Sequence, residues 1–395
     1  MSHFSRRSLL GGAAALAAGA ALPARAQQTK RKAIAIVFFS GGFNALHVTP
    51  NTLAGNFTTT PDSMMPTGTG LFVDKVSFGD LPTAALQRLA VVGVEHGITA
   101  HDPAQSALFT GTSSYPLTIA AAMQSNAALK CALLGSFSSN VRAAPVPGAS
   151  LTKVSDVQPA LDVMVGANRP GEPNRQAMAK SMRMAWNVSK PLIERNPRTL
   201  SGHATGYDSL IGALEQPVRP LDWSSIATAY GLDPSRTVVD SDAAQFAAAE
   251  LVIQGGTPIA IVTPSPDAGC GEAGWDTHGD ASGACVRAMF KRRATTHLAK
   301  FLERTLAMTD TEVTTLVFGE FGRDPFLSDH ATCLSAAVFG PRVKPGNTGP
   351  AFSRSGKLAM PPGTPGISGM WSLVAELAGV TSRPFGANPH ALVTG

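Results

Sequence analysis

Residues 33–39, AIAIVFF, form an unbroken apolar run that ends in Ser40, Gly41 and Gly42. A run of this length and β-rich composition is typical of a strand buried on both faces of a sheet. The glycines that follow it favour a sharp change of chain direction. We therefore predict a central strand here that stops in a tight turn.

Similar apolar runs follow along the chain, with helical patterns between them. The predicted strands are 89–94, 127–134, 258–262, 313–318 and 336–339. The predicted helices are 103–110, 174–188, 243–253 and 284–306. Strands that alternate with helices predict an α/β fold with a parallel or mixed central sheet. The Gly- and Pro-rich stretch 341–369 is predicted to be a long ordered loop.

Composition limits the classes of protein that fit. The chain has 395 residues, of which 44% are hydrophobic and 15% charged, and this balance excludes an intrinsically disordered chain. The net charge is +5, but three of the 32 bases lie in the first 26 residues, so 29 bases face 27 acids in the remainder. A nearly neutral remainder indicates no nucleic-acid partner.

The first 26 residues have the features of an export signal. Arg6 and Arg7 precede an apolar run that reaches Leu22, and residues 24–26 (ARA) offer a small-x-small cleavage site. The run is too short to cross a bilayer core of about 30 Å as a helix, which argues against a membrane anchor. We predict a twin-arginine signal peptide at 1–26 and a bacterial protein that is periplasmic or extracellular, with no stable membrane anchor after cleavage.

An oxidising compartment permits disulfide bonds. Four cysteines are available, Cys131, Cys270, Cys285 and Cys333, and they allow three pairings into two bridges. A bridge between Cys270 and Cys285 would close a loop around residues 275–278. The alternative is four unpaired, buried thiols.

Polar residues directly after apolar runs are candidates for a site, because ligands of open α/β sheets bind outside the carboxyl ends of the strands. Five such clusters occur: 41–44 (GGFN), 96–102 (HGITAHD), 275–278 (WDTH), 320–323 (EFGR) and 328–330 (SDH). Four of the nine histidines fall in these clusters. Trp275 and Trp371 would line the resulting cleft or, as the alternative, pack in the core.

Asp276 and His278 are two residues apart, which places both side chains on one face of an extended segment. With a further imidazole they would form a set of two histidines and one carboxylate. Such a set suits zinc, iron or a similar divalent metal and leaves coordination positions open. The alternative is an aspartate that caps a turn beside a loop histidine.

Residues 101–111 (HDPAQSALFTG) resemble the sulfatase signature Cys/Ser-x-Pro-Ser-Arg-x-x-Leu-x-Thr-Gly. More closely, the chain after residue 26 resembles domain-of-unknown-function family fifteen-hundred-and-one, which is distantly similar to the alkaline phosphatase and sulfatase superfamily. The matching motifs are 276–278 (DTH), 320–323 (EFGR) and 329–330 (DH). This resemblance implies one domain over 27–395, an alkaline-phosphatase-like three-layer sandwich with a mixed central sheet flanked by helices. It implies no established reaction.

Phosphatases of that superfamily hold two metals, and the resemblance carries the two ligand sets over unequally. The first set becomes Asp276, His278 and His330. The second set becomes Asn44, His101, Glu320 and Phe321. This second set lacks its first-strand carboxylate, because no Asp or Glu precedes Asp62. His101 also stands where the nucleophile is expected, so a conventional two-metal displacement loses two of its parts.

What remains is a single-metal site. Zinc or a similar divalent ion at Asp276, His278 and His330 would lower the pKa of a bound water towards ~7. His101 or Glu320 would act as general base, and Arg323 would hold an anionic group. The alternative is a decayed site in which Glu320 and Arg323 form a salt bridge.

Two classes of function are therefore carried forward. The first is an exported metal-dependent hydrolase that acts on a phosphate or sulfate ester, either a small molecule or an anionic ester of the cell envelope. The second is a non-catalytic binding or assembly protein of the envelope with a degraded site, which would work with a partner protein there.

Overall fold

The structure is a computed structural model, and it describes most of the chain. The described residues are 30–41, 64–137, 146–165, 175–195, 211, 221–265, 275–280, 283–323, 329–349, 351–352, 358–359 and 362–394. The predicted signal peptide, Asn44 and Cys270 lie outside these residues.

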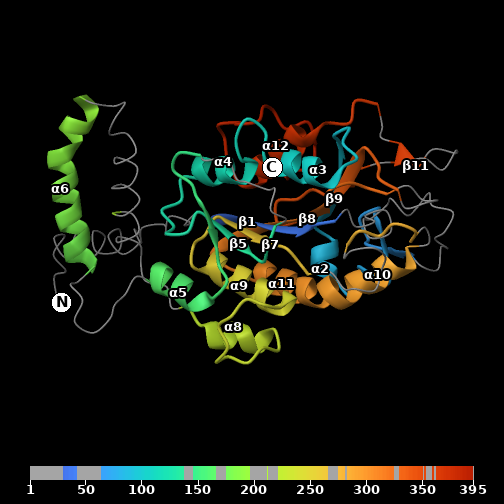
Figure 1. Cartoon of the computed structure of the whole chain (residues 1–395), viewed down its shortest axis with the longest axis horizontal. Helices are drawn as coiled ribbons and strands as arrows, with labels where there is room; N and C mark the ends of the chain where they lie inside the picture. Colours follow the sequence, from blue (N-terminus) through green and yellow to red (C-terminus); the bar gives the residue numbers. More distant parts are fainter. Residues whose placement is uncertain are drawn as a thin grey trace, which may run out of the picture.

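An eight-stranded sheet in the order β10-β4-β9-β8-β1-β7-β5-β6 forms the centre of the molecule (Figure 1). Its strands are β1 (Arg31–Phe39), β4 (Leu89–Glu95), β5 (Cys131–Leu134), β6 (Leu151–Lys153), β7 (Ile259–Val262), β8 (Thr311–Gly319), β9 (Cys333–Phe339) and β10 (Gly346–Asn347). Neighbouring strands pair in parallel except at β9, which is antiparallel to both β4 and β8. The sheet is therefore mixed, as the sequence predicts.

β1 lies between β7 and β8 and separates two hydrophobic cores. Its odd-numbered residues 33–39 point into one core, and Ile34, Ile36 and Phe38 point into the other. All seven side chains are at most 3% exposed. Alternate residues of a strand face opposite sides of the sheet, so this one segment contributes to both layers of packing.

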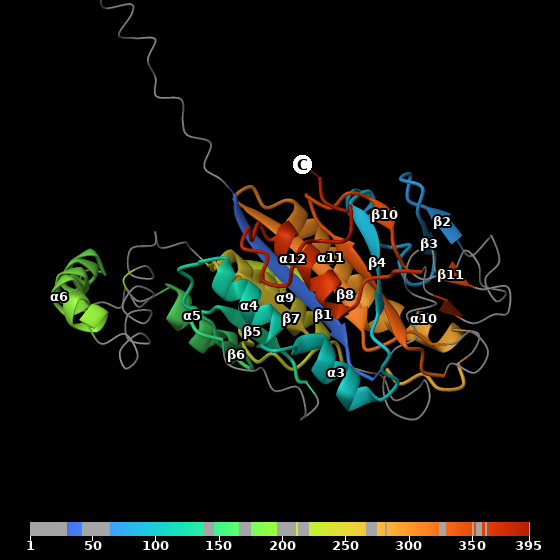
Figure 2. The same cartoon turned by 90° about the horizontal axis from the view of Figure 1, so that it is seen from above.

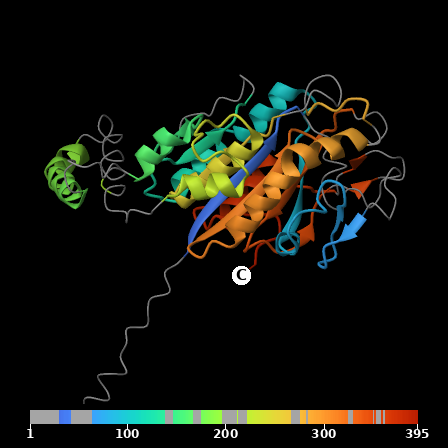
Figure 3. The ribbon, with the colours of Figure 1, turned by 90° about the horizontal axis from the view of Figure 1, so that it is seen from below.

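Helices cover both faces of the sheet (Figure 1). One face carries α3 (His101–Phe109), α4 (Tyr115–Ala122) and α12 (Ile367–Leu377). The other carries α2 (Thr83–Leu86), α5 (Val157–Val165), α8 (Trp223–Ala229), α9 (Asp242–Gln254), α10 (Ala284–Phe290) and α11 (Thr296–Leu306). Figure 3 shows α9 (yellow) and α11 (orange) on this second face, with β1 (blue) visible between them.

Smaller elements lie outside these layers. Two short antiparallel pairs join β2 (Met64–Pro66) to β3 (Phe72–Asp74) and β11 (Ala351–Phe352) to β12 (Leu358–Ala359). α6 (Arg175–Arg195) lies to one side of the sheet in Figures 1 and 2. Within the described part of the chain, no helix has both the length and the apolar character needed to cross a membrane.

The predicted strands and helices are present, with shifted boundaries. The strand expected at 127–134 begins only at Cys131. The helix expected at 284–306 is continuous through a π-helical turn at Lys291–Thr295, and α6 runs seven residues past 188 and through Pro191. The stretch 341–369 is not one loop, because β10, β11 and β12 lie in it and α12 begins at Ile367.

Candidate metal centre

The turn after β1 contributes backbone hydrogen bonds to the candidate site. Gly41 has a φ of +117°, in the region that favours glycine, and a Cβ there would lie 3.0 Å from the backbone nitrogen of Asp276. The Gly41 N–H donates to Glu320 Oε1 at 2.8 Å, and its carbonyl accepts from Arg323 Nη2 at 3.2 Å. The glycine turn predicted after the first strand thus contacts two segments, 275–276 and 320–323, that lie far from it in the sequence.

A buried tryptophan positions Asp276. Trp275 is fully buried, packs edge-on against Phe39 at 4.6 Å between ring centroids, and donates its indole N–H to the carbonyl of Pro264 at 2.9 Å. Trp275 therefore belongs to the core. Asp276 follows it at the edge of the sheet, and His278 Nε2 lies 3.4 Å from Asp276 Oδ1. The predicted proximity of these two side chains is present.

His101 is the first residue of α3 and points into the same place. Its Nδ1 lies 2.7 Å from Glu320 Oε2, and its Nε2 lies 3.3 Å from Asp276 Oδ2. The hydrogen bond with Glu320 raises the pKa of His101 above its ordinary value, against the opposing effect of partial burial. Glu320 thus fixes the ring so that Nε2 faces Asp276.

The connection from β8 to β9 supplies His330. An isolated antiparallel β-bridge pairs the backbones of Arg323 and His330. The Nδ1 atom of His330 contacts the carbonyl oxygen of Thr99. His330 Nε2 is buried and has no hydrogen-bond partner among the residues that the structure describes. Burial lowers the pKa of His330, which favours the neutral ring that a metal requires.

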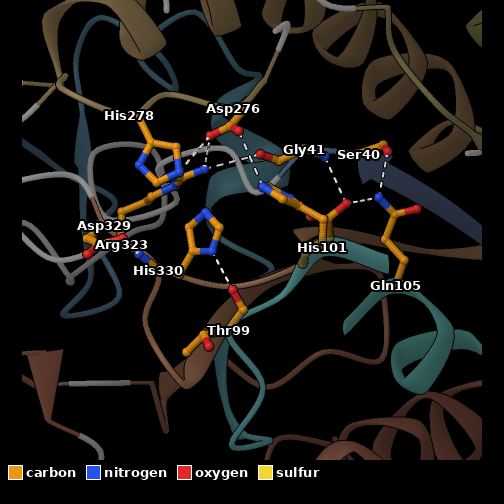
Figure 4. Close-up of polar contacts among 11 residues, drawn as sticks. Ser40, Gly41, Thr99, His101, Gln105, Asp276, His278, Arg323, Asp329 and His330 are labelled. Atoms are coloured by element: carbon orange, nitrogen blue, oxygen red, sulfur yellow. Dashed lines mark hydrogen bonds and ion pairs between the residues drawn. The ribbon is translucent and has the colours of Figure 1, made fainter. Parts of the chain in front are cut away.

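Four side chains converge at this edge of the sheet (Figure 4). One possible ligand atom from each of His101, Asp276, His278 and His330 lies within 4.8 Å of the other three. Three imidazoles and a carboxylate suit zinc, iron or manganese. The second ring nitrogen of His101 meets a carboxylate and that of His330 meets a backbone carbonyl, which is the outer-shell pattern of metal-binding histidines. The residues present therefore fit a divalent metal.

Solvent reaches one side of this cluster, whereas the other side is closed. The side chains of His101, Asp276 and His278 are 31%, 17% and 34% exposed. Glu320 and Arg323 are fully buried. A small ligand can therefore approach the cluster from the open side.

Arg323 lies on the closed side and is held there. Its Nη2 forms an ion pair with Asp276 Oδ1 and also donates to the carbonyl of Gly41. Burial lowers the pKa of Arg323, and the negative charge of Asp276 opposes this effect. The alternative salt bridge between Glu320 and Arg323 is not what the structure shows, because each group takes a different partner.

The sequence did not single out Gln105 and Thr99. Gln105 is buried on α3, donates from Nε2 to Ser40 Oγ at 2.9 Å, and contacts Glu320 Oε1. Thr99 acts through its backbone oxygen, for which no sequence signal exists. A glutamine in an otherwise apolar helical face is the one available signal, because a buried amide needs partners.

The other expected residues have varied outcomes. Phe321 is a buried ring that packs against His330 at 4.2 Å between centroids, so it offers no ligand atom. Trp371 is buried and donates to the carbonyl of Leu108. Cys131 and Cys333 are free and buried, and Cys285 is disulfide-bonded. Asn44 and Cys270 lie outside the described residues.

Comparison with known proteins supports part of the expected family relationship. Residues 222–359 match the model of a family described as protein of unknown function (DUF1501). The match includes Asp276, His278 and His330 but ends well short of His101 on the amino-terminal side. No curated protein and no solved structure matches the chain.

Proposed function

We propose that this protein binds one divalent metal ion through His101, Asp276, His278 and His330 and uses it to hydrolyse a phosphate or sulfate ester. The observation that carries the proposal is the convergence of four ligand atoms within 4.8 Å at the carboxyl edge of the sheet. A divalent metal there would polarise an ester oxygen and lower the pKa of a water molecule towards ~7.

We infer roles for His101 and Glu320 other than that of general base. His101 Nε2 faces Asp276 within the cluster, so we assign His101 as the fourth ligand. Glu320 is fully buried and accepts hydrogen bonds from Gly41 and His101, which keeps it away from any substrate. We assign it as a positioning residue that orients His101.

Arg323 likewise acts on the ligand set. Its fully buried guanidinium contacts Asp276 and Gly41, so it orients the carboxylate and offsets part of its negative charge. Recognition of an anionic substrate then depends on the metal and on the start of α3. That helix begins at His101 without a side-chain cap, and free N–H groups at a helix start favour an anion.

A non-catalytic metal protein is the second candidate, and one observation favours it. Four protein ligands complete the tetrahedral shell that zinc adopts in structural sites, whereas catalytic zinc keeps an open position. Manganese or iron, which take more ligands, would leave positions for a substrate. The identity and coordination number of the metal therefore separate the two candidates.

The fold and the amino-terminal sequence support the wider proposal. An eight-stranded mixed sheet with helices on both faces agrees with an alkaline-phosphatase-like three-layer sandwich. We also propose export by the twin-arginine route to the periplasm or beyond, which the paired arginines at 6 and 7 and the disulfide-bonded Cys285 support. The second candidate would place a partner protein in the envelope.

Metal analysis of the purified full chain tests the proposal. We expect one divalent ion per chain in the wild type and none in a His278→Ala variant. Aryl phosphate and sulfate esters are then offered to both proteins, with X-ray absorption to count the metal ligands. Turnover that disappears in His278→Ala supports the hydrolase. A four-coordinate metal with no turnover supports the second candidate, and a metal-free wild type would falsify both.

A further inference from the structure

Two adjoining cavities lie at the amino-terminal ends of the central strands, which we call the amino edge of the sheet. The candidate metal cluster lies at the carboxyl-terminal ends, the carboxyl edge. The volumes of the two cavities are about 650 Å³ and 580 Å³, and both are lined by Lys32, Gly379 and Thr381. Lys32 lies near the start of β1, and Gly379 follows the end of α12. Cavities of this size accommodate small molecules.

Lys32 lines both cavities and carries one of their positive charges. Its Nζ forms no hydrogen bond or ion pair within the described part of the chain, although Glu312 is its neighbour in register on β8. Burial lowers the pKa of Lys32, and the positive charge of Arg342 lowers it further. Two cations that face each other in a cavity are costly unless an anion joins them.

Arg342 is held in place by the end of α12. Its Nη1 donates to the carbonyls of Glu376 and Leu377 at 3.0 and 3.2 Å. The guanidinium therefore lines the second cavity in a fixed position, together with Arg383. Gly379 leaves room for Lys32 beside it, since a Cβ there would lie 2.5 Å from Lys32 Nζ.

Two acidic groups near this cavity pair have other partners. Glu376 Oε2 accepts from the Asn388 amide at 2.8 Å. Asp310 lies 3.5 Å from Arg31, which also donates to Thr311. A third acid, Glu312, raises the pKa of Lys32, but burial and the positive charge of Arg342 outweigh its effect.

Backbone conformation marks the same place independently. Gln124 and Arg383, with φ of 49° and 50°, are the two non-glycine residues at positive φ among the residues that the structure describes. Gln124 lines the first cavity and Arg383 the second. Gln124 directly follows the C-cap of α4, a position where glycine is the usual residue. Residues held at such backbone angles cluster at functional sites.

We propose that this pair of cavities is a second binding site, which takes a small molecule bearing phosphate groups on either side of Lys32. The ammonium of Lys32 contacts the bound groups from between the cavities, and Arg342 and Arg383 bind them in the second cavity. Arginine and lysine donate charge-assisted hydrogen bonds to phosphate oxygens, and a fixed guanidinium adds directional specificity. The site is independent of the metal cluster and of the hydrolase proposal.

Titration of the full chain with pyrophosphate tests the site by calorimetry in a chelator-containing buffer of constant ionic strength. We expect saturable binding in the wild type, weakened at least about tenfold in Lys32→Gln and in Arg342→Gln. The matched control is Lys300→Gln, because Lys300 is an exposed lysine paired with Glu303 at 2.9 Å. It should bind as the wild type does.

Three results would overturn the proposal: no saturable binding in the wild type, equal weakening in Lys300→Gln, or loss of binding in His278→Ala. The last would place the anion at the metal cluster, so failure here is distinct from failure of the hydrolase proposal.

If Arg342→Gln does not fold, a second variant, Arg383→Gly, still tests the proposed site. Glycine relieves the positive φ, so we expect a thermal midpoint at or above that of the wild type together with weaker pyrophosphate binding. A stable Arg383→Gly protein with unchanged affinity would contradict the assigned role of Arg383 and of the strained backbone.

Discussion

The two edges of the central sheet differ in how their charged side chains are paired. At the carboxyl edge, Arg323 pairs with Asp276 and His101 with Glu320, so each charged group meets an opposite one. At the amino edge, Lys32 and Arg342 repel each other across a cavity. The first edge gathers electron-pair donors, which suit a cation, and the second gathers cationic side chains, which suit an anion.

This difference matters because the sign of the charges at each edge, and whether each charge has an opposite partner, decide which ligands that edge can bind. Outer partners hold the donors at the carboxyl edge in one orientation before any ligand arrives, which is the preorganisation that a metal site requires. The amino edge is held by backbone conformation and by the carbonyls at the end of α12. Substitutions at the two edges should therefore change stability in opposite directions.

The largest effect is expected from Asp276→Asn. Removal of the carboxylate charge breaks the ion pair with the fully buried guanidinium of Arg323, and breaking such a buried pair costs about 3–5 kcal/mol. We expect a loss of this size in the free energy of unfolding, measured by denaturant titration, together with loss of bound metal. Asp162→Asn, an exposed change on α5, serves as the control.

A double variant sharpens this first test. Adding Arg323→Met to Asp276→Asn removes the buried positive charge that has lost Asp276 as its ion-pair partner. This double change should restore part of the lost stability without restoring metal binding. If Asp276→Asn alone proves as stable as the wild type, the ion pair does not stabilise the carboxyl edge and the contrast between the edges fails.

The next effect concerns Glu320→Gln. Glutamine retains the size of the side chain but weakens the hydrogen bond that orients His101, and loss of an outer-shell partner typically lowers metal affinity about 10- to 100-fold. Competition with a chromophoric chelator measures this change. An unaltered affinity would show that Glu320 is structural only, and a matched Glu303→Gln change on α11 should leave affinity unchanged.

The pH dependence separates the metal-free from the metal-bound protein. Because Glu320 raises the pKa of His101, protonated His101 stabilises the metal-free fold fully below about pH 6.5, and this contribution is lost as pH rises through the raised pKa. Metal binding needs the neutral ring, so affinity rises over the same interval. We expect the stability difference between wild type and His101→Gln in chelator to shrink with rising pH. A constant difference contradicts this assignment.

The smallest effect tests the amino edge and has the opposite sign. Lys32→Gln removes one of two facing positive charges, so in buffer without polyvalent anions we expect a gain of at most about 0.5 kcal/mol in the free energy of unfolding. Pyrophosphate should stabilise the wild type more than the variant in thermal melts. A loss of stability in Lys32→Gln would show that Glu312 already compensates this lysine.

The sequence predicted the strands most accurately where both faces are buried. The run 33–39 needs no long-range information, because apolar residues at consecutive positions indicate a strand between two layers. α12 was not predicted, since its first residues lie within a stretch rich in Gly and Pro. Its Met370 and Trp371 are buried against the sheet, and this packing outweighs the local composition.

Which residues gather at the carboxyl edge could be predicted, but their orientation could not. The strand-end rule brought Asp276, His278 and His330 to one edge, and the structure places them there with His101. Pattern alone does not reveal that His101 and Glu320 pair across 219 residues, or that Arg323 turns inward. The amino edge carries no motif, because its cavities are lined by strand starts and helix ends.

The position of β1 in the sheet also bears on the order in which the proposed metal ligands come together during folding. β1 can take its place in the sheet only after β7 and β8 have been synthesised, because it pairs with both of them. The hydrogen bond between Arg323 and Gly41 likewise joins residues 282 apart. Such distant pairings form late, because closing long loops is entropically slow. A chain still under synthesis holds His101 long before His330 is made, so a complete cluster appears only once the central strands have paired. A metal ion would then bind only after the chain has folded, and its binding would slow unfolding.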